Sequence, residues 1–196
     1  MHKNLSVTEK EKIKIYINEA LVFNKKHNIF TRANKDEVFE KDILDCIPLI
    51  EKINPKSKIL DLGSGGGFPG IVLAILRPDC EIHLLEKSQK KCYFLNKIKD
   101  VLGLPNIKVL KHTITKSNKL ESYSIITARA FSSTEKILSL TEKNLKKDGK
   151  YLLLKGRIEK IEEEMTAINT NNYKYEIIEL DNKKYERHIV MIKKNE

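Results

Sequence analysis

The sequence predicts an α/β protein built on a mostly parallel sheet of seven strands, and three observations lead to that prediction. After residue 56, short apolar runs alternate with longer amphipathic stretches, which is typical of β-α-β units. One of these runs leads directly into a glycine-rich turn and a helical pattern. The last two runs have no helical pattern between them, so we expect them to form an antiparallel hairpin.

A helical extension is expected to precede the sheet. Apolar residues recur at helical intervals between residues 6 and 53. Residues 31–34 interrupt this pattern, and Pro55 ends it. We therefore expect an N-terminal helical extension, residues 1–55, and a main domain, residues 56–196.

The main domain follows from the same patterns. The expected strands are residues 58–62, 81–86, 107–110, 124–128, 151–155, 175–180 and 188–192. The expected helices are residues 70–76, 89–102, 134–145 and 158–168. Ser132, Ser133 and Thr134 are all candidates to cap the third helix, and Asp181 and Asn182 are expected to form the turn of the hairpin.

The composition fits one folded domain with a basic surface. Hydrophobic residues make up 40% of the 196 residues, so there is enough apolar material for a core. The net charge of +10 favours an anionic partner, since clustered cations attract phosphates. Only five of the 37 basic residues are arginine, and a lysine bias can also arise from base composition. Charge alone therefore leaves two alternatives, a nucleic-acid surface or a merely solvated lysine-rich one.

The cysteine spacing and the apolar runs exclude several classes of protein. Cys46, Cys80 and Cys92 are odd in number and lack the C-x-x-C spacing, so neither a disulfide framework nor a metal site is expected. No signal peptide is recognisable, and no apolar run approaches the roughly 20 residues that a membrane span requires. We expect a cytoplasmic protein that does not enter a membrane.

The glycine-rich turn is the strongest motif of the chain. From residue 61 to residue 70 the sequence reads Asp-Leu-Gly-Ser-Gly-Gly-Gly-Phe-Pro-Gly, between an expected strand and an expected helix. Glycines without Cβ allow a ligand to approach the backbone, and the first N–H groups of the helix are unpaired there. The motif favours a nucleoside cofactor, with a purely structural turn as the alternative.

Two cofactor classes fit the glycines, and one acidic residue separates them. Gly65, Gly67 and Gly70 have the spacing of the dinucleotide fingerprint, and Glu86 follows at a strand end, where an acid can bind ribose hydroxyls or remain a solvated surface residue. Asp61 would repel a pyrophosphate but suits a cofactor that has a sulfonium and an ammonium group. The sequence therefore favours S-adenosylmethionine over NAD.

A reductase pair is the remaining sign of NAD chemistry. Tyr151 and Lys155 have the spacing of such a pair. That spacing brings two side chains to one face only when the residues lie on a helix. The surrounding residues read as a buried strand, so we expect Tyr151 to lie in the core.

At this point the motifs become specific to one family. Residues 61–70 closely resemble the first motif of the RsmG (GidB) methyltransferases of bacterial small-subunit rRNA, and the Phe-Pro-Gly ending narrows the resemblance to that family. Residues 23–29 and 43–47 resemble the family's helical extension, so the resemblance covers nearly the whole chain. Four further stretches resemble other motifs of the family, in the same order along the chain: residues 85–95, 128–131, 154–156 and 186–190.

Two positions in the extension depart from the family's pattern. Phe30 stands where the family usually has Thr, and Asp42 stands where it usually has His.

The resemblance implies a Rossmann-like S-adenosylmethionine-dependent methyltransferase fold and a reaction on RNA. The implied reaction transfers a methyl group to N7 of a guanine, guanine 527, in 16S rRNA of the small ribosomal subunit. Guanine N7 has an in-plane lone pair, so the transfer needs alignment rather than a strong base. The chain lacks the Asn/Asp-Pro-Pro-aromatic turn of exocyclic-amine methylases, and Cys80 and Cys92 lack the context of a cytosine C5 nucleophile.

The resemblance and the motifs together give the expected site residues. Arg129 follows a strand beside the glycine-rich turn and is expected to align the reactants, with no general base, unless it only forms a surface ion pair. The residues expected to bind the cofactor are Asp61, Gly63, Ser64, Gly65, Gly67, Phe68, Glu86, Ile114, Thr115 and Arg129. The residues expected to contact RNA are Asn28, Lys155, Arg187 and His188, with simple solvation as the alternative.

Two functions from different classes fit these expectations. The first is an rRNA guanine-N7 methyltransferase that acts as a monomer on 16S rRNA or the small subunit. The second is a non-catalytic RNA-binding or ribosome-assembly factor on a methyltransferase scaffold. The intact glycine-rich turn, Asp61 and Glu86 favour the first.

Overall fold

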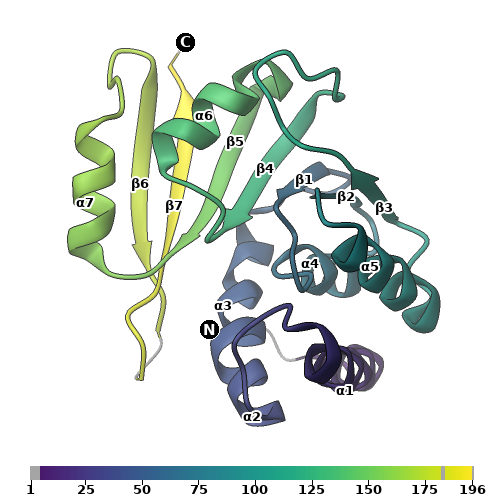
Figure 1. Cartoon of the computed structure of the whole chain (residues 1–196). Helices are drawn as coiled ribbons and strands as arrows, with labels where there is room; N and C mark the ends of the chain where they lie inside the picture. Colours follow the sequence, from purple (N-terminus) through teal and green to yellow (C-terminus); the bar gives the residue numbers. More distant parts are fainter. Residues whose placement is uncertain (1–4, 182–183, 196) are drawn as a thin grey trace.

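A single seven-stranded sheet organises the computed structural model, which describes residues 5–181 and 184–195 (Figure 1). The strand order is β3-β2-β1-β4-β5-β7-β6. Strands β1 to β5 pair in parallel, and β7 runs antiparallel between β5 and β6. The predicted α/β fold with a mostly parallel sheet and a C-terminal antiparallel hairpin is therefore confirmed.

All seven predicted apolar runs form strands. Their bounds are β1 Lys58–Leu62, β2 Glu81–Glu86, β3 Ile107–Lys111, β4 Tyr123–Arg129, β5 Leu145–Lys155, β6 Tyr173–Glu179 and β7 His188–Lys194. The largest departure is β5, which begins at Leu145 and not at Tyr151, because Leu145 already pairs with Tyr123 before a bulge. The residues after Leu145 are polar and exposed, so their sequence gave no apolar signal for this part of the strand.

The helices of the main domain follow the predictions closely. Helices α4 (Gly70–Leu76) and α5 (Gln89–Leu102) have the expected bounds. Helix α6 (Thr134–Thr141) ends earlier than expected, since a 3-10 turn, η3 (Glu142–Asn144), follows it. Helix α7 is Ile158–Thr166. The residue before α6 that occupies the cap position is Ser133, whose side chain makes no capping hydrogen bond. The predicted hairpin turn falls partly outside the described residues, because Asn182 is not among them.

The extension is helical, as expected, and irregular in its second half. Helix α1 (Val7–His27) begins with a capping box, in which Ser6 Oγ accepts from Glu9 N and Glu9 Oε2 accepts from Ser6 N. After a break, four short pieces follow: α2 (Lys35–Val38), the π-helical turn η1 (Phe39–Ile43), α3 (Leu44–Cys46) and the 3-10 helix η2 (Ile47–Lys52). These pieces place residues 35–52 beside the ends of β4 and β7 (Figure 1).

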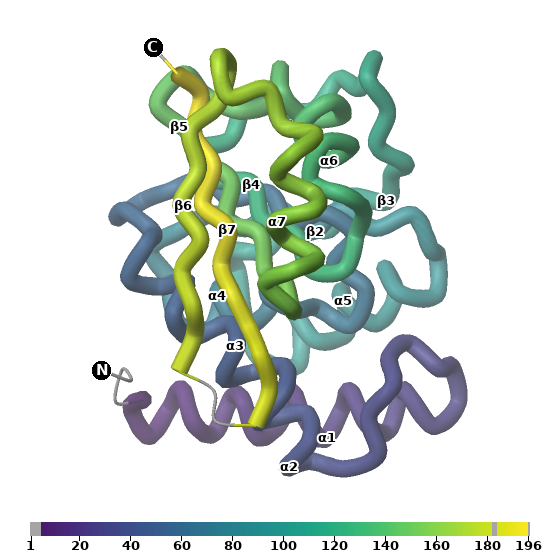
Figure 2. Tube along the Cα trace, turned by 90° about the vertical axis from the view of Figure 1, so that its left-hand side faces the viewer, coloured from purple at the N-terminus to yellow at the C-terminus, as the bar shows by residue number. Residues whose placement is uncertain are grey.

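Helices cover both faces of the sheet and give the protein two hydrophobic cores (Figures 1 and 2). Helices α1, α4 and α5 pack on one face, and α6 and α7 pack on the other. Successive strand residues point to opposite faces, so Leu152 and Leu154 join the first core while Tyr151 and Leu153 join the second. Tyr151 is fully buried in the core, as predicted. None of the helices in the described ranges combines the length and apolar character that a bilayer crossing requires.

Candidate active site

Two cavities lie side by side at the end of the sheet where the parallel strands have their carboxyl ends. There β1 leads into α4 on one face and β4 leads into α6 on the other, and open α/β sheets bind ligands at such a switch point. The Glu86 cavity has a volume of about 460 Å³, and the Arg129 cavity has a volume of about 500 Å³. Residues 130–132, which we call the dividing segment, line both cavities.

The glycine loop, residues 63–69, joins β1 to α4 at this end of the sheet. The backbone N–H groups of Gly63 and Ser64 both donate to Leu85 O, at 2.8 and 3.1 Å. Tyr16 of α1 is fully buried, and its hydroxyl donates to Gly66 O at 2.6 Å. The loop is therefore held from the sheet by β2 and from below by the extension.

Gly65 is the place in the loop where a ligand can approach the backbone. Its φ of +56° is a conformation that favours glycine, and a Cβ built there would have only Gly63 O within 4 Å, at 3.5 Å. A Cβ at Gly63, by contrast, would overlap the ring of Phe131. The loop is thus open at Gly65 and closed over Gly63 by the dividing segment.

Asp61 provides a buried negative charge under the loop. Its side chain is fully buried, and Oδ2 accepts from Gly70 N at 3.2 Å. Its other oxygen, Oδ1, has no hydrogen-bond partner among the described residues. Burial raises the pKa of Asp61 to about 7. A buried carboxylate with an unpaired oxygen is costly unless a cation or a donor joins it.

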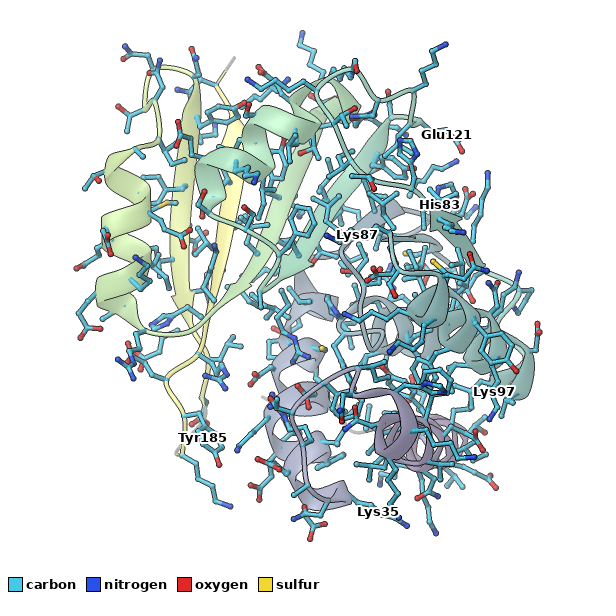
Figure 3. All side chains as sticks on the ribbon, in the orientation of Figure 1. Lys35, His83, Lys87, Lys97, Glu121 and Tyr185 are labelled. Atoms are coloured by element: carbon cyan, nitrogen blue, oxygen red, sulfur yellow. The ribbon has the colours of Figure 1, made fainter. Side chains whose placement is uncertain are left out.

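Glu86 ends β2 and faces the first cavity. Its carboxylate accepts from Gly65 N at 3.0 Å and from Ser88 N at 2.8 Å, so both oxygens are fixed in direction. Glu86 is 6% exposed and lines the Glu86 cavity together with Lys87, which Figure 3 labels, and Ile114. A fixed carboxylate beside an apolar wall is suited to a pair of sugar hydroxyls and a planar base.

These observations test whether the residues fit S-adenosylmethionine. The unpaired oxygen of Asp61 suits the cationic part of that molecule, and the open backbone at Gly65 allows its close approach. Glu86 suits its ribose, and the cavity volume lies in the usual range for small-molecule sites, about 300 to 1,000 Å³. The residues present therefore fit the group.

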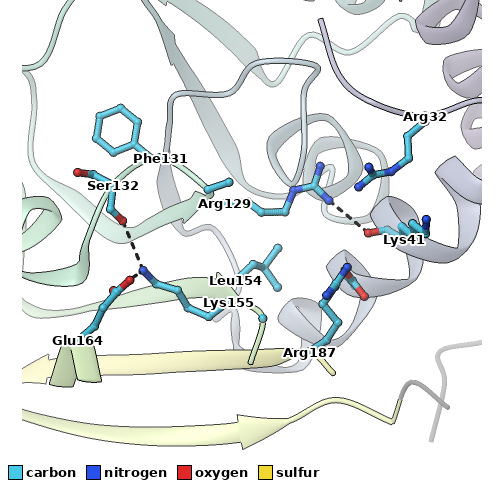
Figure 4. Close-up of a pocket in the computed structure, with 12 residues that line it drawn as sticks. Arg32, Lys41, Arg129, Phe131, Ser132, Leu154, Lys155, Glu164 and Arg187 are labelled. Carbon is cyan, nitrogen blue, oxygen red and sulfur yellow. Dashed lines mark hydrogen bonds and ion pairs between the residues drawn. The ribbon is translucent and has the colours of Figure 1, made fainter. Parts of the chain in front are cut away.

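The Arg129 cavity is strongly basic (Figure 4). Its walls come from the extension, from the ends of β4 and β5, and from the start of β7. The cationic side chains that line it are Arg32, Lys41, Arg129, Lys155 and Arg187, against the acidic side chains of Asp45 and Glu164. Three of the five arginines of the chain thus meet in one cavity, which suits an anionic, planar ligand.

Arg129 is the last residue of β4, directly before the dividing segment, and it lines the Arg129 cavity. Its Nη1 donates to Asp42 Oδ1 at 2.6 Å and to Lys41 O at 3.4 Å. Its guanidinium also lies over the Phe68 ring, 4.9 Å from the centroid. Burial disfavours its charge, but the nearby Asp42 carboxylate favours it, and the pKa of Arg129 lies above its ordinary value.

The dividing segment is held in a strained conformation. Ala130 has φ of +52°, which costs a residue with a Cβ about 1 to 2 kcal/mol. This conformation turns the chain sharply after β4, so that Phe131 packs over Gly63. The Phe131 ring therefore stands between the glycine loop and the Arg129 cavity.

Two of the residues expected to contact RNA line the Arg129 cavity. Lys155 Nζ lies 2.7 Å from Glu164 Oε2, and Arg187 Nε lies 2.8 Å from Asp45 Oδ2. The other two lie elsewhere. Asn28 is the left-handed cap residue at the end of α1, and His188 is 5% exposed with Nδ1 bonded to Gly156 O.

The expected cofactor residues divide in a similar way. Gly63, Glu86 and Ile114 line the Glu86 cavity. Thr115 does not line it, and its carbonyl oxygen accepts from Asn118 N at 3.1 Å and from Asn118 Nδ2 at 2.8 Å. Ser64, Gly67 and Phe68 are buried residues of the glycine loop itself and do not line the cavity. Among the wall residues that were not predicted, His112 and Thr113 come from the same loop as Ile114.

Sequence reasoning missed the contribution of the extension. Arg32, Lys41 and Asp45 line the Arg129 cavity, Asp42 pairs with Arg129, and Tyr16 holds the glycine loop. One signal was available, since Asp42 and Asp45 are three residues apart and so share a helical face. Nothing in their spacing indicated which cations that face would meet.

Comparison with known proteins identifies a family with a similar sequence. The family model described as rRNA small subunit methyltransferase G matches residues 9–190. A ribosomal RNA small subunit methyltransferase G of Brachyspira hyodysenteriae is 40% identical over 186 residues, which are 94% of this chain and 90% of that protein.

Solved structures of more distant proteins share the fold. The precorrin-6y C5,15-methyltransferase of Geobacter metallireducens has a TM-score of 0.62 and 14% identity, covering 85% of this chain and 94% of that chain. Coclaurine N-methyltransferase, bound to N-methylheliamine and SAH, has a TM-score of 0.54 and 20% identity, covering 76% of this chain and 52% of that chain. At these identities the similarity concerns the fold alone.

Proposed function

The chain belongs to the rRNA small subunit methyltransferase G family, and on that premise we propose that it transfers the methyl group of S-adenosylmethionine to N7 of a guanine in 16S rRNA. The single observation that supports this most directly is the shared wall between the two cavities. A cavity suited to the cofactor and a basic cavity suited to a nucleotide meet at residues 130–132. The resemblance of the motifs adds guanine 527 as the proposed target.

The cofactor is proposed to lie across the glycine loop. Asp61 would neutralise its cationic part from below, Glu86 would accept from its ribose hydroxyls, and Ile114 would pack on its base. The binding residues proposed here are those of the sequence prediction that line or support the Glu86 cavity. When bound, the cofactor supplies a methyl group on a sulfonium, which a nitrogen lone pair can take without prior loss of a proton.

The target guanine is proposed to enter the Arg129 cavity. Its N7 lone pair lies in the plane of the base, so the protein must hold that plane toward the dividing segment. Arg129 can do so, because Nε and Nη2 have no partner among the described residues and form the two-pronged edge of the guanidinium. Lys155 and Arg187 are then proposed to contact the neighbouring phosphates.

The reaction is tested by incubating the full chain with small ribosomal subunits that lack the modification and with methyl-labelled S-adenosylmethionine. Digestion of the rRNA and mass spectrometry of the nucleosides should show one 7-methylguanosine per 16S rRNA. Cleavage at the modified base followed by primer extension should place it at guanine 527. Label in another nucleoside, or at another guanine, would contradict the proposed specificity.

A variant of the glycine loop provides the matched control. Replacing Gly65 by Val puts a branched side chain where the backbone must be open and φ is positive, so cofactor binding should be lost. Calorimetric titration with S-adenosylmethionine separates the outcomes for the wild-type chain. Tight cofactor binding without methyl transfer to any subunit preparation would leave a binding or assembly factor as the better description.

A further inference from the structure

A buried carboxylate of the extension joins two of the arginines at the Arg129 cavity. Asp42 is 1% exposed. Arg32 binds it through both prongs of its guanidinium, with Nε 2.9 Å from Oδ2 and Nη2 3.0 Å from Oδ1. Arg129 binds the same Oδ1 through Nη1 at 2.6 Å. Figure 4 shows the side chains of Arg32 and Arg129 approaching one another at this point.

The local backbone directs Asp42 to this position. Asp42 belongs to the π-helical turn η1 (Phe39–Ile43), a widened turn that interrupts regular helix and is frequent at functional sites. The Asp42 carbonyl accepts from Cys46 Sγ at 2.9 Å, and the preceding carbonyl, Lys41 O, lies 3.4 Å from Arg129 Nη1. The turn thus presents a carboxylate and a carbonyl to the same arginine.

Two of the contacts of Arg129 fix its orientation most directly. Asp42 holds Nη1 from one side, and the guanidinium lies over the Phe68 ring of the glycine loop, 4.9 Å from its centroid. Without the carboxylate, the like charges of Arg32 and Arg129 would repel each other in a poorly solvated region. The negative charge of Asp42 therefore keeps two guanidiniums together and leaves the other edge of Arg129 open toward the cavity.

We infer that Asp42 is a positioning residue for the methyl transfer, which it serves by orienting Arg129 from within the N-terminal extension. The inference rests on the proposed function. Asp42 itself does not line the cavity, so it acts through Arg129 and makes no contact with the target base. The extension thereby belongs to the reaction machinery and is not only a cover for the sheet.

A double-mutant cycle tests this inference in the full chain. Asp42→Asn should lower kcat on small subunits by roughly tenfold or more, while KM for S-adenosylmethionine changes by less than about twofold. In an Arg129→Lys background, the same substitution should cost less than about threefold, because two residues that act through one contact are not additive. Asp42→Glu keeps the charge but displaces the carboxylate, so it should lower kcat by about fivefold and provides a second variant if Asp42→Asn folds poorly. Full additivity of Asp42→Asn and Arg129→Lys would overturn the inference.

A bidentate ion pair away from both cavities provides the control. Asp79 binds Arg77 through Nε and Nη2, both at 2.8 Å. Asp79→Asn should lower the melting temperature and leave kcat unchanged.

Labelling with phenylglyoxal followed by peptide mapping reports on Arg129 without turnover. Asp42→Asn should raise the labelling rate of Arg129 by at least about threefold, because the guanidinium loses its buried partner, and it should leave Arg77 unchanged. Unchanged labelling of Arg129 would show that Asp42 does not hold it. This measurement still decides the question if the wild-type chain proves inactive on small subunits, a result that would count against the proposed function alone.

Discussion

At the scale of single residues, Asp61 places a buried carboxyl group beneath the glycine loop. The carboxylate is fully buried, one of its oxygens has no partner among the described residues, and burial raises its pKa to about 7 from the ordinary 3.8. In the unliganded protein the group is therefore close to half protonated at neutral pH. A cationic ligand beside it would favour the charged form and release the proton.

The first prediction is a pH-dependent affinity for S-adenosylmethionine. Binding requires the charged carboxylate, so lowering the pH from 8 to 6 through a pKa of about 7 should weaken the affinity by about tenfold. Calorimetry in buffers of different ionisation enthalpy should show proton release that grows as the pH falls below 7. Asp61→Asn, which cannot ionise, should bind weakly and without this pH dependence; a wild-type affinity that is flat between pH 6 and 8 would contradict the assignment.

The sign for protein stability is the opposite of that for binding. The pKa of Asp61 in the folded, unliganded protein lies above its unfolded value, so the native state binds more protons between about pH 4 and 7. The stabilising contribution of the protonated group is therefore present below the unfolded pKa and is lost as the pH rises through about 7. Cofactor binding should restore stability where the group is charged.

The second prediction concerns the two-pronged edge of Arg129. Arg129→Lys keeps the charge beside Asp42 but replaces a planar fork by a single ammonium. Turnover on small subunits should fall by roughly tenfold or more, about 1.4 kcal/mol of lost alignment, while nonspecific RNA affinity is retained. Single-turnover kinetics with saturating cofactor measures this directly. If Arg129→Lys transfers the methyl group at the wild-type rate, Arg129 has only a structural role.

At the scale of elements, helix α1 supports the glycine loop from outside the sheet. Tyr16 lies in the middle of α1, and its hydroxyl donates to Gly66 O in the loop. Its ring packs on Phe68, with centroids 5.1 Å apart, and Phe68 in turn lies under Arg129. One helix of the extension thus contacts the glycine loop and is linked to Arg129 through Phe68.

The third prediction is that Tyr16→Phe loosens the loop without unfolding the protein. The substitution leaves Gly66 O without its buried donor, which should cost about 1 to 3 kcal/mol of stability. Affinity for S-adenosylmethionine should fall by several-fold, because the loop must be ordered again on binding. Urea unfolding and calorimetric titration measure the two effects. Tyr93→Phe, on the exposed side of α5, is the matched control and should change neither.

At the scale of the whole molecule, the extension and the sheet share one core. The cluster on the first face joins buried residues of the extension, such as Ile13, Val38 and Leu49, to α4, α5 and the strands. All seven residues of α4 are buried, although the helix lies outside the sheet. Helix α1 runs beneath α4 and α5 (Figure 2), and it and the pieces that follow it contribute apolar side chains to this cluster.

The fourth prediction is that residues 56–196 alone do not form a stable protein. Removing the extension would expose the apolar surface of α4 and leave Arg129 without Asp42, so burial and charge pairing would both be lost. Circular dichroism should show no cooperative thermal transition for the fragment, and gel filtration should show aggregation. A cooperative transition near that of the full chain would mean that the extension is an appendage with its own role.

Much of the fold was predictable because it depends on neighbours in sequence. The bounds of β1, β2, α4 and α5 followed from apolar periodicity and from the glycines between them. The early start of β5 did not, since Leu145 pairs with Tyr123 ahead of a bulge and residues 146–148 after it are polar. The burial of His188 was also missed, because the sequence did not show that β7 lies between β5 and β6, where His188 pairs with residues on both sides.

The sequence by itself determined the fold class and the position of the glycine loop, and it predicts Asp61 and Glu86 as binding residues, because each of these depends on residue types at short, fixed spacings. Only the tertiary structure decided what faces Arg129. Asp42 lies 87 positions away in sequence, and the two meet because the π-helical turn lies beside the end of β4. Ion pairs between distant segments depend on packing that no local pattern encodes, so the pairing of Arg129 with Asp42 and Arg32 could be found only in three dimensions.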